Sequence, residues 1–332
     1  MIETGDCSAV MRRWVAEGVK VQMCVTSPPY WGLRDYGVSG QLGLESTPQD
    51  YVANMVEVFR LVRELLADDG TLWLNLGDSY AGSWGNSGSR PELDGKTQNQ
   101  REKNGEYLPR GGWDNRRDRP ASSYALPGLK SKDLVGIPWR VAFALQADGW
   151  YLRSDIIWAK PNPMPESVRD RCTKSHEYIF MLSKKAKYYY DADAIAEPVA
   201  ATTVVRAKAN NNAASRKDGG AATDQCGLTP EQQGKYYADI DAESTRNKRS
   251  VWTVTTKPFK GAHFATFPPD LIEPCILAGS RPGDTVLDPF GGSGTTGMVS
   301  AKHGRKFRLI DLNPEYVALT QKRIRTPLDG LL

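Results

Sequence analysis

A glycine-rich segment between an apolar strand and a helix constrains the fold of this 332-residue chain most strongly. The segment, residues 288–294 with the sequence DPFGGSG, follows an apolar stretch at Thr285–Leu287 and precedes a helix that we predict at Thr295–His303. Glycines in such a turn let the backbone approach a ligand at the carboxyl edge of a sheet. The segment therefore predicts a strand–turn–helix unit of a parallel sheet, with a small-molecule site at the turn.

Predicted strands and helices alternate along the chain. We predict strands at Val21–Thr26, Thr71–Leu76, Tyr151–Trp158, Tyr178–Ser183, Thr285–Leu287 and Lys306–Ile310. We predict helices from Pro48 to about Leu66, at Pro138–Ala147, Pro269–Ala278 and Thr295–His303, and from Pro314 onward. This alternation predicts an α/β fold with a mostly parallel sheet covered by helices on both faces.

Composition narrows the class of protein. Apolar residues make up 40% and charged residues 25% of the chain, as in a globular protein with a substantial core. The net charge of +4 allows a polyanionic partner without requiring one. The five cysteines form no Cys-x-x-Cys pair, which favours reduced thiols in a cytoplasmic protein without structural zinc. We expect no secretion signal and no membrane-spanning segment.

Two polar stretches interrupt the alternation. Residues Ala81–Lys130 and Ala200–Arg249 are rich in polar residues and glycine and show no apolar period, and the second ends in a basic run. Loops of this length inside a compact domain are usually either functional or disordered. We favour a partner-binding role for the second stretch and leave both readings open for the first.

Several ligands suit the glycine-rich segment. A nucleotide-hydrolysing P-loop needs a lysine after its last glycine, and Thr295 stands there instead. Residues 292–297 match the dinucleotide pattern G-x-G-x-x-G, and Asp311 ends the next strand, where a carboxylate can bind ribose hydroxyls. Both NAD and S-adenosylmethionine carry such a ribose, so this pattern does not separate them. A plain glycine turn with a helix-capping aspartate is the structural alternative.

A second segment, Ser27-Pro28-Pro29-Tyr30, suits the binding of a planar amine. Two prolines fix the backbone and leave their carbonyls as acceptors. The Ser27 hydroxyl and the Pro28 carbonyl can accept both N–H groups of an exocyclic amine, and Tyr30 can stack on its ring. Acceptors aimed at developing positive charge are an electrostatic form of catalysis. A proline-rich strand end with no catalytic role is the alternative for this segment taken alone.

Together, and in this order, the two segments resemble the S-adenosylmethionine-dependent amino-group DNA methyltransferases of the beta class, whose catalytic motif precedes the cofactor motif. The resemblance covers most of the chain outside the two polar stretches, and Asp311 replaces the glutamate usual in the family. It implies the catalytic residues Ser27, Pro28, Pro29 and Tyr30. It implies the cofactor-binding residues Asp288, Pro289, Phe290, Gly291, Gly292, Ser293, Gly294, Thr295, Asp311, Asn313 and Phe267.

The resemblance also implies an architecture. The fold expected is a Rossmann-like methyltransferase fold with circularly permuted motif order. The chain would divide into a catalytic half at 1–192 with a loop insertion at about 81–130, a target-recognition region at 193–256 and a cofactor-binding half at 257–332. Residues 5–7 resemble a short element near the adenine, and His176 is either a catalytic or a structural histidine.

The implied reaction is methyl transfer to an exocyclic amine of a base that is rotated out of duplex DNA. It needs neither a metal ion nor a covalent enzyme intermediate. Serine at the first motif position resembles the N4-cytosine group, whereas aspartate is typical of N6-adenine enzymes. We therefore favour cytosine N4 and keep adenine N6 as the alternative. Duplex DNA is the expected partner, in the cytoplasm of a bacterium or of a virus-infected cell. Two further partners are kept as alternatives: a restriction endonuclease that acts on the same site, and a second copy of this chain in a homodimer.

Two other activities compete with this interpretation. One is methylation of RNA or of protein amides. Amide methyltransferases use a related Asn-Pro-Pro-Tyr motif, but usually after the cofactor motif, so the motif order and the large central insertion here count against it. A DNA-binding module without catalysis would not require both motifs to be intact.

Overall fold

The computed structural model describes residues 1–33, 38, 40–81, 128–205, 241, 243–256 and 267–328. They belong to two compact units, Met1–Tyr189 with Val251–Leu332, and Tyr190–Ser250. Most of the two predicted polar stretches, including the asparagine run at 210–212, lies outside the described residues. None of the helices described is both long and apolar enough to cross a membrane.

The larger unit is built on one mixed sheet, which in the described part of the chain has eight strands. Their order is β1 (Ile2–Thr4), β10 (Lys306–Asp311), β9 (Thr285–Asp288), β2 (Val21–Thr26), β3 (Leu66–Leu76), β5 (His176–Ser183), β4 (Tyr151–Ala159) and β8 (Val251–Thr253). The first five strands are parallel, β5 runs antiparallel to both neighbours, and β8 is parallel to β4. The predicted mostly parallel α/β sheet is thus confirmed.

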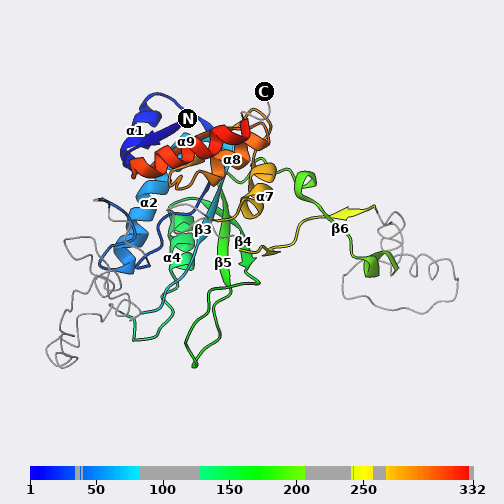
Figure 1. Cartoon of the computed structure of the whole chain (residues 1–332), viewed down its shortest axis with the longest axis horizontal. Helices are drawn as coiled ribbons and strands as arrows, with labels where there is room; N and C mark the ends of the chain where they lie inside the picture. Colours follow the sequence, from blue (N-terminus) through cyan, green and yellow to red (C-terminus); the bar gives the residue numbers. More distant parts are fainter. Residues whose placement is uncertain are drawn as a thin grey trace, which may run out of the picture. The chain divides into compact units, whose positions relative to one another are not determined.

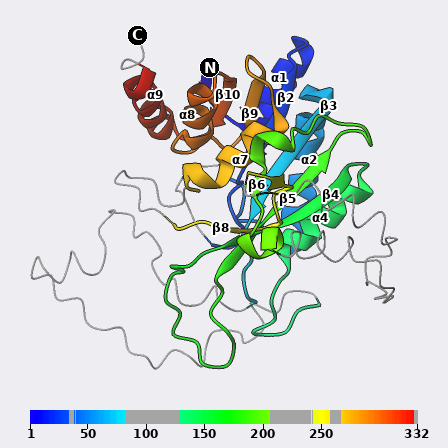
Figure 2. The same ribbon diagram turned by 90° about the vertical axis from the view of Figure 1, so that its right-hand side faces the viewer.

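Helices cover both faces of this sheet. They are α1 (Cys7–Ala16), α2 (Pro48–Leu65), α4 (Ile137–Ala147), α7 (Pro269–Gly279), α8 (Thr295–Lys302) and α9 (Pro314–Leu328). Helices α1, α2 and α4 form one layer, whereas α7, α8 and α9 lie on the opposite side (Figures 1 and 2). The smaller unit contains a two-stranded antiparallel ladder of β6 (Glu197–Pro198) and β7 (Thr245–Arg246).

Local capping explains where the first helices begin. Thr47 precedes α2 in an extended conformation, its hydroxyl accepts the Asp50 amide hydrogen, and Pro48 occupies the first helical position, as predicted. Asp6 caps α1 in the same way through the amide of Ala9. Helix α1 was not among the predicted elements, although its buried residues recur at helical spacing.

Strand β3 begins earlier than predicted, at Leu66 rather than Thr71. The register against β2 shifts, because Val21 pairs with Leu66 and Met23 pairs with Thr71. The extra residues therefore form a bulge rather than a separate turn. Gly70 is required there, since a Cβ on it would lie 2.8 Å from the carbonyl oxygen of Gln22.

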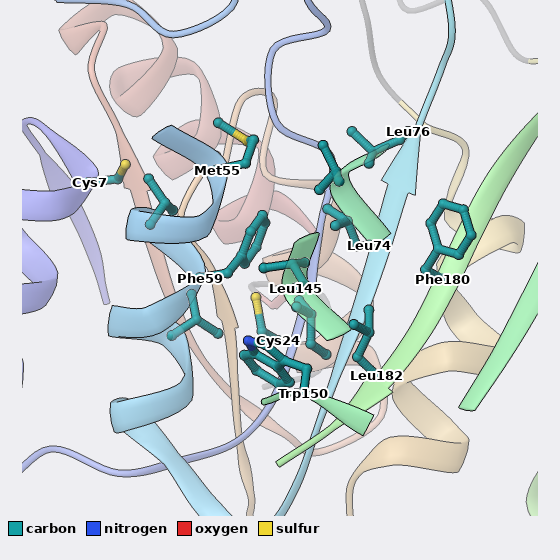
Figure 3. Packing of buried hydrophobic residues seen from close by; sticks show 14 of the residues in the cluster. Cys7, Cys24, Met55, Phe59, Leu74, Leu76, Leu145, Trp150, Phe180 and Leu182 are labelled. Atoms are coloured by element: carbon teal, nitrogen blue, oxygen red, sulfur yellow. The ribbon is translucent and has the colours of Figure 1, made fainter. Parts of the chain in front are cut away.

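On the face of the sheet that α1, α2 and α4 cover, the hydrophobic core lies between the sheet and helices α2 and α4 (Figure 3). It joins side chains from strands far apart in sequence, and the labelled members on these elements are Cys24, Met55, Phe59, Leu74, Leu76, Leu145, Phe180 and Leu182. All of these side chains are fully excluded from solvent. Such burial makes the carboxyl edge of β2 and β3 a rigid support for the residues that follow them.

Candidate active site

A cavity opens where the carboxyl ends of β1, β10, β9 and β2 meet. The chain leaves β9 toward β10 on one side, and leaves β2 toward β3 on the other, so the cavity lies at a topological switch point of the sheet. Its walls are formed by Gly5, Asp6, Cys7, Ser27, Pro29, Val38, Gly40, Gln41, Leu42, Phe267, Asp288, Pro289, Phe290, Gly291, Gly292, Ser293, Thr295, Asp311, Leu312, Asn313 and Tyr316. Segments separated by most of the chain length therefore share one site.

This cavity brings together most of the residues predicted as site residues. From the Ser-Pro-Pro-Tyr segment, Ser27 and Pro29 line it, and all the predicted cofactor residues except Gly294 do so too. Of the predicted site residues, all of which the structure describes, Pro28, Tyr30 and Gly294 are not part of the wall. Pro28 is buried, and Gly294 precedes α8 in the left-handed region with φ +76°. Their roles in binding or catalysis stay predictions.

Asp288 joins the two halves of the site. Its Oδ1 accepts hydrogen bonds from Thr26 Oγ1 at 2.6 Å and from the Phe290 amide at 3.1 Å, and its Oδ2 accepts one from Thr296 Oγ1 at 2.7 Å. Its side chain is buried, and this burial raises the pKa of Asp288 to about 6 in spite of these three donors. The carboxylate thus ties the end of β2 to the glycine-rich turn.

The buried Asp288 predicts a pH-dependent stability. The folded state binds the Asp288 proton more tightly than the unfolded state, so its contribution is complete below the ordinary pKa of 3.8 and is lost as the pH rises from there to about 6. Asp288→Asn cannot ionise. Between pH 3 and 7 the free energy of unfolding of the wild type should fall relative to that of Asp288→Asn by about 3 kcal/mol. Urea denaturation across this range measures the difference, and a difference independent of pH contradicts the prediction.

Asp311 holds the backbone of the glycine-rich turn. Its Oδ2 accepts the Gly292 amide hydrogen and its Oδ1 accepts that of Asn313, both at 2.8 Å. Partial burial raises the pKa of Asp311, and the two amide donors oppose that rise. The turn packs closely on β10, since a Cβ on Gly291 would lie 3.1 Å from Leu309 Cβ. A carboxylate at the cavity wall beside tightly packed backbone could hold a hydroxylated ligand.

Helix α9 supports the same turn, which the sequence alone did not indicate. Thr320 Oγ1 donates to the Gly292 carbonyl at 2.7 Å. Arg323 Nη1 donates to the carbonyl and the hydroxyl of Ser293, both at 2.9 Å, and to Thr295 Oγ1 at 3.0 Å. Partial burial lowers the pKa of the Arg323 guanidinium. Nothing in the local pattern around residue 323 signals a contact with residues 293–295.

The wall also contains residues that the predicted site lacked. Gly5, Asp6 and Cys7 follow β1, in the segment that resembled the family element near the adenine. Leu312 and Tyr316 follow β10, and residues 38 and 40–42 complete the wall. His176 is not part of this wall in the described structure, and its ring lies edge-on to Tyr178 with the centroids 5.3 Å apart.

The Ser-Pro-Pro-Tyr segment is braced from two sides. The buried Tyr51 of α2 donates its hydroxyl hydrogen to the Pro29 carbonyl at 2.9 Å, which fixes the turn after β2. The Tyr30 hydroxyl lies 2.6 Å from Glu177 Oε2, and Ser27 Oγ lies 3.2 Å from the Tyr30 hydroxyl. Burial, together with Glu177, raises the pKa of Tyr30 well above its usual range. Tyr30 therefore stays protonated.

Comparison with known proteins identifies the family. The model of the N6/N4 methyltransferases, described as DNA methylase, matches residues 21–322. The chain belongs to this family of DNA methylases. It is 47% identical over 327 residues to the Type II methyltransferase M.Cfr9I of Citrobacter freundii, covering 97% of this chain and 86% of that protein.

Two solved structures share the fold of this DNA methylase. One is the PvuII DNA methyltransferase (cytosine-N4-specific), at 18% identity and a TM-score of 0.55, covering 97% of this chain and 85% of that one. The other is the M1.HpyAVI–SAM complex, at 17% identity and a TM-score of 0.50, covering 97% and 98%. The predicted Rossmann-like methyltransferase fold is thereby confirmed.

S-adenosylmethionine is the cofactor of the family, and the cavity of this DNA methylase suits it. The backbone of the glycine-rich turn lines the cavity, and the Asp311 carboxylate lies in the same wall, where it could accept hydrogen bonds from hydroxyl groups. Phe267, Phe290 and Leu312 supply apolar surface to the same wall. A polar end, an apolar wall and a backbone cradle in one cavity match the parts of this molecule.

Proposed function

We propose that this DNA methylase transfers a methyl group to the exocyclic N4 amine of cytosine in duplex DNA. The observation that carries the proposal is the position of Ser27, which stands first in the Ser-Pro-Pro-Tyr segment and lines the same cavity as the glycine-rich turn. Serine at this position resembles the N4-cytosine group, whereas aspartate is typical of N6-adenine enzymes. The finer assignment therefore depends on one residue.

In this proposal the chain holds and polarises the amine. The amine nitrogen is a poor nucleophile because its lone pair is delocalised into the ring. Ser27 Oγ and the Pro28 carbonyl accept its two hydrogens and favour a nitrogen with more tetrahedral character. Tyr51 keeps the turn in place through the Pro29 carbonyl. When bound, S-adenosylmethionine supplies an electrophilic methyl group.

The target base has to leave the duplex before it reaches this cavity, since its amine is otherwise inaccessible for transfer. We propose that Tyr30 stacks on the displaced base, as predicted from the sequence. Its hydroxyl is anchored at Glu177, so the base would stack on a ring that is already held in place. Phosphate contacts would come from elsewhere in the chain.

We further propose that 193–256 is the target-recognition region between a catalytic half at 1–192 and a cofactor half at 257–332. The described part contains a basic cluster in which Glu197 Oε1 accepts hydrogen bonds from Arg246 and Arg249 at 3.1 and 2.5 Å. One carboxylate between two guanidinium groups leaves this cluster net positive. Such a cluster suits a DNA backbone.

The test is mass spectrometry of nucleosides from unmethylated genomic DNA incubated with the protein and S-adenosylmethionine. We expect N4-methylcytosine. N6-methyladenine would overturn the assignment to cytosine and retain the family. If no modified nucleoside appears in DNA, RNA or protein amides become the leading candidate substrates. DNA binding without transfer to any of these substrates would indicate a module that has lost catalysis.

The relatives named Type II methyltransferases suggest a biological setting. We propose that the chain protects its recognition site from a companion restriction endonuclease. Sequencing of the methylated DNA would give the site, and DNA methylated by the enzyme should then resist a nuclease that cuts there. Gel filtration with light scattering would test whether the chain forms a homodimer.

A further inference from the structure

A chain of polar side chains runs from the cavity wall into the sheet. It begins at Ser27 Oγ, which lies 3.2 Å from the Tyr30 hydroxyl. The Tyr30 hydroxyl lies 2.6 Å from Glu177 Oε2 and 3.1 Å from Asn75 Oδ1. On the other side, Glu177 Oε1 pairs with the ammonium of Lys160. Ser27 lines the cavity, whereas Glu177 lies behind it on β5.

Both oxygens of Glu177 face hydrogen-bond donors. Lys160, which can only donate, contacts Oε1, and its ammonium also lies 4.2 Å from the centroid of the Trp158 ring. The Asn75 amide nitrogen lies 3.2 Å from Oε2. The orientation of Asn75 is fixed because the same nitrogen also donates to the Tyr178 carbonyl at 3.1 Å. A carboxylate is the side-chain group that offers an acceptor on both sides.

This arrangement sets the direction of the hydroxyl hydrogens of Tyr30 and Ser27. Glu177 in its ion pair accepts and does not donate, so the single hydrogen of the Tyr30 hydroxyl points toward Glu177 and Asn75. The Tyr30 oxygen is then free to accept from Ser27. The Ser27 hydrogen therefore points away from the cavity, and lone pairs of Ser27 Oγ remain on the cavity side.

The position of Tyr30 is itself constrained. Gly77 follows β3, and a Cβ added there would lie 2.5 Å from Tyr30 Cε2. The tyrosine ring thus packs directly on the backbone of residue 77. This packing keeps the hydroxyl between Ser27 and Glu177, since the ring has no room to shift toward β3.

We propose that Glu177 is a positioning residue for methyl transfer, acting through Tyr30 to present Ser27 Oγ as an acceptor toward the target amine. The inference rests on the proposed function, because an amine needs acceptors, whereas a carbonyl substrate would need donors. Neither Glu177 nor Tyr30 has to touch the amine for this role. Their contribution is the direction of one hydrogen bond.

Glu177→Gln reverses this direction with little change in shape. The glutamine oxygen has to face Lys160, so its amide nitrogen faces Tyr30 and the fixed Asn75 nitrogen. Tyr30 then loses its charged acceptor, and Ser27 is no longer held as an acceptor toward the cavity. We expect kcat to fall about 30-fold, below the 10² to 10³ expected from removing a direct contact, with cofactor affinity and the KM for DNA unchanged.

The decisive experiment is a double-mutant cycle of Glu177→Gln and Tyr30→Phe, with kcat measured on duplex DNA that contains the mapped site. If Glu177 acts through Tyr30, the double variant should be no slower than the slower single variant within about twofold. Multiplicative losses in kcat would overturn the inference, as would wild-type rates in both single variants. Tyr30→Phe retains the ion pair of Glu177, so it stays informative if Glu177→Gln does not fold.

Glu273→Gln is the matched control. Glu273 lies on α7, where its Oε1 accepts from Lys302 Nζ at 2.7 Å and lies 2.6 Å from His303 Nε2, outside the cavity wall. It should reduce thermal stability without changing kcat. Cofactor binding by calorimetry and thermal unfolding are measured for every variant. If Glu177→Gln lowers stability or cofactor affinity with kcat unchanged, the role of Glu177 is structural. If the wild type methylates no DNA, it is the proposed function that fails.

Discussion

Replacing Ser27 by alanine should reduce kcat for DNA methylation at least about 100-fold, the loss expected when one preorganised polar contact to the reacting group is removed. Ser27 lines the cavity and offers the side-chain acceptor that the amine requires. The cofactor cradle around Asp311 does not depend on the Ser27 hydroxyl. Affinity for S-adenosylmethionine should therefore stay within about twofold of wild type. Single-turnover transfer of a radiolabelled methyl group and calorimetric titration measure the two quantities.

Ser183→Ala serves as the control for this substitution. Ser183 is a buried serine at the end of β5, where its hydroxyl donates to the Lys185 carbonyl at 2.8 Å. Loss of this hydrogen bond should cost about 1 kcal/mol of stability and leave kcat unchanged. Turnover near wild type in Ser27→Ala, or a loss confined to cofactor affinity, would show that the amine is held by other groups.

Replacing Gly294 by alanine should destabilise the protein by about 3 kcal/mol and weaken cofactor binding. Gly294 has a φ of +76°, which costs an alanine about 1 to 2 kcal/mol. In addition, its Cβ would lie 2.3 Å from Thr320 Cγ2, an overlap that costs about 1 to 3 kcal/mol in a packed core. Because Thr320 also donates to the Gly292 carbonyl, displacing it loosens the turn. Denaturant unfolding and calorimetric titration test both effects.

Two further variants separate the causes. Gly304→Ala has a similar φ of +70° with no heavy atom within 4 Å of its Cβ, so it should lose only the backbone contribution of about 1 to 2 kcal/mol. Combining Gly294→Ala with Thr320→Ser removes the overlapping methyl group and retains the hydroxyl. This pair should recover part of the lost stability. Equal losses in Gly294→Ala and Gly304→Ala would disprove the steric contribution.

Local signals allowed much of the fold to be predicted from the sequence. Thr47 with Pro48 marks the start of α2, and Gly149 and Gly304 follow the ends of α4 and α8 with positive φ. Such signals depend on a few neighbouring residues and on backbone sterics. The start of β3 was missed because Asp68-Asp69-Gly70 is typical of a turn, whereas pairing with β2 retains these residues in the strand as a bulge.

The candidate site could be predicted in part. The residues that line the cavity around the two motifs were identified from their sequence alone, because each motif is continuous. The partners behind them were not, since Glu177 lies 147 residues from Tyr30 and Arg323 lies 30 residues from Ser293. No periodicity connects such positions. They meet because β5 pairs with β3, and because α9 packs near the turn after β9.

The adjacency of β2 and β9 has a consequence for the synthesis of the protein. Thr26 and Asp288 are hydrogen-bonded neighbours although 262 residues separate them. At translation rates of 5 to 20 residues per second, roughly 10 to 50 s pass between the emergence of the two strands from the ribosome. Throughout this interval one edge of β2 has no native partner, and an open strand edge can pair with another chain. The nascent polypeptide is therefore open to such pairing at β2 until β9 has been made.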